Sequence, residues 1–232
     1  MRLAAPRAHF GHGGGSPYSH ALLGGGALTM RESTSVGPVG DLPALAVMDV
    51  DRYVADADEV DRAVLARTAG AVLDLGCGPG RMVRAAVLAG RRALGIDVSA
   101  TAVDIAQADG LPVLERDLSG ALPCEGSWDT VLLLDGNIGI GGDPTELLDR
   151  CRSLMSAGGR VLLETDPDPA VDRRLLAEVV DRLGRASDPF PWAQIGVNAL
   201  IGCAAEVGLR VEWTWTAGRS GTAARTFVAL SG

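Results

Sequence analysis

The stretch Ala71-Val72-Leu73-Asp74-Leu75-Gly76-Cys77-Gly78-Pro79-Gly80-Arg81 decides the fold of this chain. It begins as an apolar run too short for a helix, continues as three glycines at alternate positions, and leads into residues with helical apolar spacing. This order predicts a strand, a tight turn and a helix. Glycine is needed where the backbone takes a positive φ or where a ligand lies against it, and the helix start adds free N–H groups. The stretch is therefore typical of a nucleotide-type binding site.

The glycine spacing distinguishes this turn from the dinucleotide fingerprint, which reads Gly-x-Gly-x-x-Gly. Here the spacing is Gly-x-Gly-x-Gly, and Asp74 stands two residues ahead of the first glycine. All 21 basic residues are Arg. A chain without Lys has no Schiff-base lysine, no phosphate-loop lysine and no Tyr-x-x-x-Lys reductase pair, so several enzyme classes are excluded.

Length and composition indicate one α/β domain with an extension. The chain has 232 residues, of which 47% are hydrophobic and 22% charged. Its net charge of −8 argues against a nucleic-acid partner, because such binding depends on neutralising phosphates. The four cysteines have no Cys-x-x-Cys spacing, so no metal site is predicted. No secretory signature or membrane-spanning apolar run is present, and we expect a cytoplasmic protein that has no membrane partner.

The chain divides into three parts by composition. Residues 1–26 are rich in Gly, Ala, His and Ser and predict a flexible N-terminal tail. Residues 27–55 contain two short β-like runs, Ala27–Arg31 and Leu42–Val47, which predict an N-terminal hairpin or lid. Residues 56–232 form the main domain.

Apolar runs and helical periodicities alternate through the main domain. We expect strands at Ala71–Leu75, Ala93–Ile96, Leu111–Glu115, Asp129–Leu134, Arg160–Glu164, Val211–Thr216 and Thr226–Leu230. We expect helices at Asp56–Arg67, Arg81–Ala89, Ala100–Ala108, Pro144–Leu154, Ala170–Leu183 and Ala193–Val207. This alternation predicts a parallel sheet with helical crossovers, and the last two strands predict an antiparallel hairpin.

Acidic residues follow four successive strands, at the edge of the sheet where ligands bind in this architecture. Asp97 lies 17 residues past Gly80, where a carboxylate can accept hydrogen bonds from ribose hydroxyls. Asp117 suits the edge of a base, and Asp135 faces the centre of the cleft. Any single acid can instead cap a helix or face water. Four carboxylates together would repel a pyrophosphate and favour an adenosine that carries a cation.

The combined motifs resemble those of class I S-adenosylmethionine-dependent methyltransferases, over residues 55–232. Val-Leu-Asp74-Leu-Gly76-Cys-Gly78-Pro-Gly80-Arg is similar to their first motif, and Gly-Ile-Asp97-Val-Ser to the acidic motif of their second strand. The motif around Asp117 and those at the fourth and fifth strands match as well. The resemblance implies an α/β fold with a doubly wound, mostly parallel, seven-stranded Rossmann-like sheet, an antiparallel C-terminal hairpin strand and an N-terminal extension.

The resemblance also implies S-adenosylmethionine as cofactor and assigns residues to it. The implied cofactor-binding residues are Asp74, Gly76, Cys77, Gly78, Gly80, Arg81, Asp97, Val98, Asp117, Leu118, Asp135, Gly136 and Asn137. Among them the glycines would face the methionine part, Asp97 the ribose, and Asp117 with Leu118 the adenine. Arg81 would either face the methionine carboxylate or be solvated.

The implied reaction is methyl transfer to a small-molecule acceptor by in-line displacement, which chiefly requires alignment. No catalytic residue stands out, and Asp135, Asn137 and Glu164 are the candidates. The glycine-rich loop Asp135–Pro144 indicates either a close approach to a ligand or a plain strand-to-helix connection. Tyr53 is a candidate lid residue, and Trp192 either covers the acceptor or packs in its loop. The sequence leaves open a non-catalytic, regulatory S-adenosylmethionine-binding protein and a nicotinamide-dependent oxidoreductase, and it does not indicate an oligomeric state.

Overall fold

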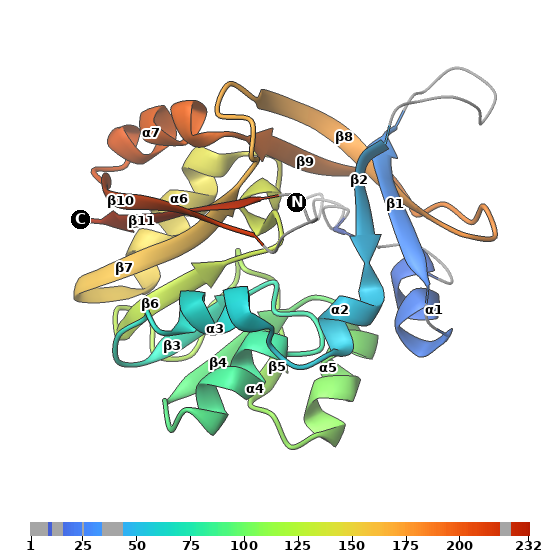
Figure 1. The fold of residues 1–232 in the computed structure, drawn as a ribbon, viewed down its shortest axis with the longest axis horizontal. Coiled ribbons are helices and arrows are strands. Elements are labelled where there is room, and N and C mark those ends of the chain that lie inside the picture. Colours follow the sequence, from blue (N-terminus) through green and yellow to red (C-terminus); the bar gives the residue numbers. More distant parts are fainter. Residues whose placement is uncertain (1–8, 11–15, 25, 34–43, 219–223) are drawn as a thin grey trace, which may run out of the picture.

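The computed structural model describes residues 9–10, 16–24, 26–33, 44–218 and 224–232, and two β-sheets form the framework of this part (Figure 1). The larger sheet has seven strands in the order β10-β11-β7-β6-β3-β4-β5. These strands are β3 (Val72–Leu75), β4 (Ala93–Asp97), β5 (Val113–Glu115), β6 (Trp128–Leu133), β7 (Met155–Thr165), β10 (Arg210–Ala217) and β11 (Arg225–Ser231). β3 to β7 run parallel, and β11 is antiparallel to both of its neighbours. The predicted fold class is confirmed.

Helices cover this sheet. They are α3 (Glu59–Leu65), α4 (Arg81–Leu88), α5 (Ala100–Ala108), the 3-10 turn η1 (Asn137–Gly139), α6 (Pro144–Leu154) and α7 (Val197–Glu206). The Ser99 hydroxyl accepts a hydrogen bond from an N–H in the first turn of α5, and Asp143 caps α6 ahead of a proline. Such caps satisfy N–H groups that the helix itself leaves unpaired.

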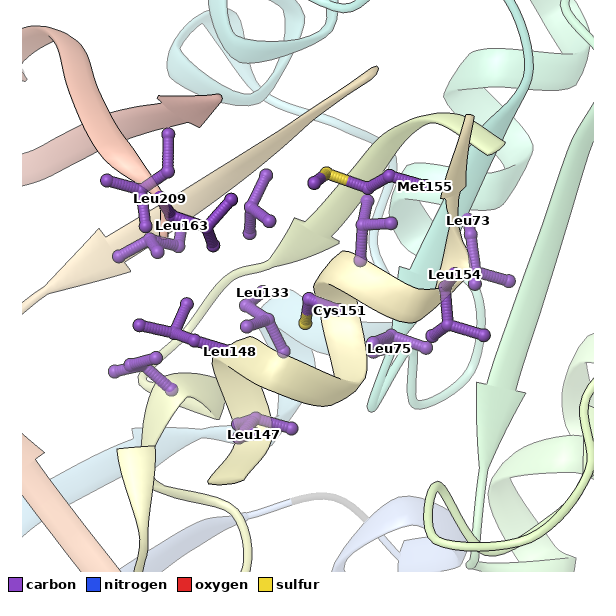
Figure 2. Packing of buried hydrophobic residues seen from close by; sticks show 14 of the residues in the cluster. Leu73, Leu75, Leu133, Leu147, Leu148, Cys151, Leu154, Met155, Leu163 and Leu209 are labelled. Atoms are coloured by element: carbon purple, nitrogen blue, oxygen red, sulfur yellow. The ribbon is translucent and has the colours of Figure 1, made fainter. Parts of the chain in front are cut away.

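The core lies between α6 and the central strands. Figure 2 shows Leu148, Cys151 and Leu154 of α6 among leucines of β3, β6 and β7. All four residues of β3 are buried, as a strand covered on both faces requires. This packing fixes the carboxyl ends of the parallel strands and the turns that follow them.

The smaller sheet has four antiparallel strands in the order β2-β1-β8-β9. Its strands are β1 (Ala27–Glu32), β2 (Ala44–Asp49), β8 (Asp172–Asp181) and β9 (Phe190–Ile195). β1 and β2 pair antiparallel close to the two predicted β-like runs, and residues 34–43 between them lie outside the described part. The helix predicted at Ala170–Leu183 is wrong: the segment is β8, in which Ala177 and Val179 are buried in alternation. Pairing with both β1 and β9 outweighs the local helical spacing.

The second predicted C-terminal helix begins later than expected. The predicted range Ala193–Val207 starts inside β9, and α7 begins only at Val197. Ala193 pairs with Arg174 of β8, so the first residues of the predicted range belong to a strand and not to the helix.

Two short helices lie near the start of the chain. α1 (Pro17–Gly24) precedes β1, and α2 (Val50–Val54) follows β2 and leads into the main domain. Sequence reasoning did not anticipate α1, whose Tyr18 and Ala21 pack on Leu28, Val50 and Ala102. Residues 1–8 and 11–15 of the predicted tail lie outside the described part, so the boundaries at 26 and 55 stay predictions. In the part of the chain that the structure describes, no helix is long and apolar enough to cross a membrane.

Candidate functional site

A cavity of about 960 Å³ lies at the carboxyl ends of the parallel strands and extends to the smaller sheet. Its floor includes the turn after β3, the end of β4 and the segment after β6. Eleven predicted cofactor-binding residues line it, namely Asp74, Gly76, Cys77, Gly78, Arg81, Asp97, Val98, Asp117, Leu118, Asp135 and Asn137. Gly80, Gly136 and Glu164 are not among the residues that line the cavity.

The three glycines of the turn have positive φ angles, of 70° at Gly76, 54° at Gly78 and 86° at Gly80. A Cβ on Gly76 would lie 2.6 Å from the side-chain nitrogen of Asn137. A Cβ on Gly78 would lie 3.1 Å from the Tyr18 hydroxyl. A Cβ on Gly80 would instead meet Leu111 at 2.9 Å, away from the cavity. The first two glycines keep the cavity floor bare, whereas Gly80 allows α4 to pack closely.

Asp97 ties the glycine turn to the end of β4. One carboxylate oxygen accepts a hydrogen bond from the backbone N–H of Gly78 at 2.7 Å, and the other from Ser99 at 2.8 Å. Burial raises the pKa of Asp97, and these two N–H groups oppose the rise. Each oxygen retains a further lone pair toward the cavity.

Asp117 and Leu118 border the cavity after β5. Asp117 accepts hydrogen bonds from the backbone N–H and the hydroxyl of Ser119, both at 2.8 Å. His9 lies 3.3 Å from the other Asp117 oxygen and borders this end of the cavity. The carbonyl of Leu118 accepts a hydrogen bond from Arg150 of α6. No sequence motif indicates that His9 belongs to this site.

The Asp74 carboxyl lies at the end of β3 and is only 4% exposed. Burial raises its pKa to about 7, although Arg81 opposes the shift. Within the described residues, no group donates a hydrogen bond to this side chain. A buried polar group without a partner is costly, so Asp74 is suited to a cationic or hydrogen-bonding ligand in the cavity.

Below the cavity, three arginines and three carboxylates form a network that we call the arginine–carboxylate cluster. Its members are Arg52 of α2, Asp61 of α3, Arg81 of α4, Asp135 after β6, Glu164 of β7 and Arg225 of β11. The Asp61 side chain is 0% exposed and lies within 3.1 Å of three guanidinium groups. The cluster holds three charges of each sign, so its net charge is zero.

Arg81 lines the cavity and is held in place by two carboxylates of the arginine–carboxylate cluster. Its side chain is 4% exposed, so it is not solvated. Its guanidinium lies 3.1 Å from Asp61 and 2.7 Å from Asp135, so both carboxylates already neutralise it. Arg81 therefore links the first helix after the glycine turn to the strand end that carries Asp135.

The three candidate catalytic residues have structural contacts. Burial raises the pKa of Asp135, but Arg81, Arg52 and Arg225 outweigh it and lower the value to about 2. Asn137 donates hydrogen bonds to the carbonyls of Leu75 and Gly76, at 3.0 and 2.8 Å. Glu164 accepts from Arg225 and from the backbone N–H of Asp135. At neutral pH, Asp135 is a carboxylate of very low basicity and so a poor general base.

The glycine-rich loop Asp135–Pro144 packs closely on β9. A Cβ on Gly139 would overlap the carbonyl of Ala193, and one on Gly142 would lie 2.9 Å from Pro191. Asp135 itself has a φ of 55°, which is rare for a residue with a side chain. The close approach that the loop composition predicts is thus made to a strand of the smaller sheet.

The comparisons with known proteins agree with this fold. Residues 72–159 match the family model described as a methyltransferase domain. A search of curated protein sequences finds no relative that matches the chain. Among solved structures, an S-adenosylmethionine-dependent methyltransferase from Bacteroides fragilis, in complex with S-adenosyl-L-homocysteine, is similar with a TM-score of 0.69. It is 20% identical, and the match covers 94% of this chain and 93% of that one.

Two further similar structures have named acceptors. The magnesium protoporphyrin IX methyltransferase from Synechocystis is 19% identical, with a TM-score of 0.53 and coverage of 75% of this chain and 76% of that one. The 1,6-didemethyltoxoflavin-N1-methyltransferase from Burkholderia thailandensis is 18% identical, with a TM-score of 0.52 and coverage of 77% of each chain. Residues 72–159 match a methyltransferase domain, and the chain shares its fold with S-adenosylmethionine-dependent methyltransferases. Both findings agree with the resemblance that the sequence motifs indicated.

Proposed function

We propose that this chain transfers a methyl group from S-adenosylmethionine to a small-molecule acceptor. The observation that carries the proposal is the bare glycine floor at Gly76 and Gly78, flanked by the buried carboxyls of Asp74 and Asp97. This donor set fits the cofactor: an ammonium group suits Asp74, vicinal hydroxyls suit Asp97, and a flat chain suits a floor without Cβ atoms.

The remaining cofactor contacts follow from position. Asp117 and Leu118, next along the sheet edge, would hold the adenine, and His9 would border it. Asp135 and Asn137 would border the path between sulfur and acceptor. When bound, the cofactor would supply a methyl group on a positively charged sulfur. An acceptor lone pair would bond to the methyl carbon in line with the carbon–sulfur bond, and the electrons of that broken bond would stay on sulfur.

The chain's own contribution is alignment and exclusion of water. Segments outside the seven-stranded sheet border the cavity, so an acceptor placed there is held over the strand ends. Because the pKa of Asp135 is held at about 2, it does not provide a neutral-pH base. An acceptor proton would leave to water, or the acceptor would react as a neutral nucleophile.

Titration calorimetry with S-adenosylhomocysteine and, separately, with NAD tests the cofactor assignment. We expect heat of binding with S-adenosylhomocysteine only. Binding of NAD alone would overturn the proposal and favour an oxidoreductase. A radiolabelled methyl-transfer screen against a metabolite pool then tests catalysis, since tight cofactor binding without any product would indicate a non-catalytic, regulatory protein.

A further inference from the structure

One wall of the cavity is built by segments outside the seven-stranded sheet, and we call it the aromatic wall. It comprises Phe10, Met48 of β2, Tyr53 of α2, and Pro191 and Trp192 of β9. Figure 1 shows β1, β2, β8 and β9 gathered into a sheet beside the larger one, with α2 between them. The cavity extends beyond the glycine floor to this wall, so it has a mostly apolar side that we call the apolar compartment.

The aromatic wall is held in place before any ligand arrives. The ring of Phe10 lies edge-on to Phe190 at 5.5 Å between centroids, and Phe190 lies edge-on to Trp192 at 6.0 Å. Trp192 is 7% exposed, and a backbone bridge joins it to Ile140. Edge-to-face pairs of this kind are favourable beyond the area they bury. Trp192 is therefore a fixed, largely buried part of the wall, and the half-buried side chains of Phe10, Met48 and Tyr53 beside it provide the accessible apolar surface, which suits a flat ligand.

Charge on this side of the cavity is already balanced. Arg81, which lines the cavity and belongs to the arginine–carboxylate cluster, is paired with Asp61 and Asp135. Arg52 and Arg225 behind it are paired with the same two carboxylates. An anionic ligand would have to leave water without gaining a free cation, and it would meet Asp135. Burial of an unpaired charge is unfavourable, so this compartment selects against acids.

Two hydroxyl groups remain available in the cavity. Tyr18 and Tyr53 both line it, and within the described residues neither hydroxyl makes a hydrogen bond. Tyr18 is 5% exposed. Burial raises the pKa of both hydroxyls, so each keeps its proton and can donate a hydrogen bond. Hydroxyls that border the cavity and make no hydrogen bond to the described protein groups are available to a ligand that carries an oxygen or nitrogen atom.

We propose, on the basis of the proposed function, that the acceptor is an uncharged planar aromatic molecule. It lies against Met48 and Phe10, beside Trp192, and its oxygen or nitrogen atom hydrogen-bonds to the Tyr53 hydroxyl. The apolar, fixed wall provides the stacking surface, the neutral cluster excludes acids, and the unpartnered hydroxyl orients the reacting atom.

Calorimetry on the full chain saturated with S-adenosylhomocysteine tests this proposal with two matched probes, 2-naphthol and 6-hydroxy-2-naphthoate. The probes share a flat ring system and a hydroxyl, and they differ by one carboxylate. We expect 2-naphthol to bind at least tenfold more tightly. Equal affinities, tighter binding of the naphthoate, or no binding of 2-naphthol would overturn the acceptor proposal. Failure of S-adenosylhomocysteine to bind would instead count against the proposed function.

Two substitutions on β2 locate the probe. Met48 lines the cavity, whereas Val47 points to the other face of the strand and is 70% exposed. Met48→Arg places a cation in the aromatic wall, so we expect it to bind the naphthoate at least tenfold more tightly than the unmodified chain does. Val47→Arg adds the same charge outside the cavity and should leave both affinities unchanged. Unchanged S-adenosylhomocysteine affinity shows that each variant is folded, and an equal response of the two variants would place the probe elsewhere.

Discussion

The guanidinium of Arg81 lies 2.7 Å from the carboxylate of Asp135, and this contact joins the first helix after the glycine turn to the end of β6. The same carboxylate lies 2.6 Å from Arg52 of α2 and 3.2 Å from Arg225 of β11. One side chain thus holds segments that are 83 and 90 residues distant along the sequence. The cavity floor and the N-terminal elements that border the cavity are connected through this buried ion pair.

Removing one charge from the arginine–carboxylate cluster should destabilise the fold strongly. In Asp61→Asn the amide keeps the shape of the side chain, but three arginines then face two carboxylates. Breaking a buried ion network on one side typically costs about 3–5 kcal/mol, and we expect a loss of that order in the free energy of unfolding. Urea denaturation followed by circular dichroism measures it. Asp149→Asn, on an exposed pair with Arg152, should change stability by less than about 1 kcal/mol. Similar effects of the two variants would contradict a special role for the cluster.

Replacing Asp97 should weaken cofactor binding. The carboxylate would lose its hydrogen bonds to ribose, and charge-assisted bonds contribute about 1.5–3 kcal/mol each. For Asp97→Ala we therefore expect the affinity for S-adenosylhomocysteine, measured by calorimetry, to fall at least about tenfold. Asp97→Asn keeps one oxygen for the N–H of Gly78 and should preserve the turn while still binding more weakly. Asp104→Ala, on the exposed face of α5, is the matched control, and unchanged affinity in both Asp97 variants would reject the assignment.

Local signals explain which parts of the fold could be predicted. The buried run of β3, the glycine turn and the cap at Ser99 lie within a few residues of the elements that they specify. β8 has no such local specification. Its residues fit a helix until β1 and β9 pair with both of its edges, and those partners are distant in the sequence. Helix α1 is fixed in the same way, by Tyr18 packing on distant residues.

In the candidate site, too, residues near a local motif could be predicted, and residues that meet only through distant contacts could not. The positions of Asp97 and Asp117 after successive predicted strands were enough to predict that both border the cavity, and both line it. Gly80 has the expected positive φ, but the sequence did not reveal that it contacts Leu111 and not the ligand space. The ion pair between Asp61 and Arg225 spans 164 residues and has no sequence signal. Side chains that meet only through tertiary packing therefore escape motif-based reasoning, and the second wall of the cavity consists mostly of such residues.

Binding of S-adenosylhomocysteine should depend on pH through Asp74. Its pKa in the free protein is about 7, so below this pH the carboxyl carries a proton. An ammonium group favours the ionised form, and binding must then release the proton. We expect affinity to rise as pH increases from 5 to 7, by up to about tenfold per unit, and to level off above 7.

Calorimetry at pH 6 in two buffers of different ionisation enthalpy measures this proton release directly. The unmodified chain should release close to one proton per ligand bound. Asp74→Asn cannot ionise, so its affinity should be weaker and almost independent of pH between 5 and 7. A steep pH dependence that persists in Asp74→Asn would assign the linked proton to another group.

A methyl group added at Gly139 should disturb the contact between η1 and β9. The new Cβ would overlap the carbonyl of Ala193 and approach the Trp192 ring, so β9 or the loop must move. Overpacking of this kind typically costs about 1–3 kcal/mol, and we expect Gly139→Ala to lower the free energy of unfolding by that amount. Gly202→Ala is the matched control, because it lies in α7 with open space around it and should stabilise the chain by about 0.5–1 kcal/mol. If the free energy of unfolding falls for Gly139→Ala and rises for Gly202→Ala, the packing against β9 requires a glycine at position 139. If both variants are stabilised, the loop moves without cost, and the contact with η1 does not hold Trp192 in place.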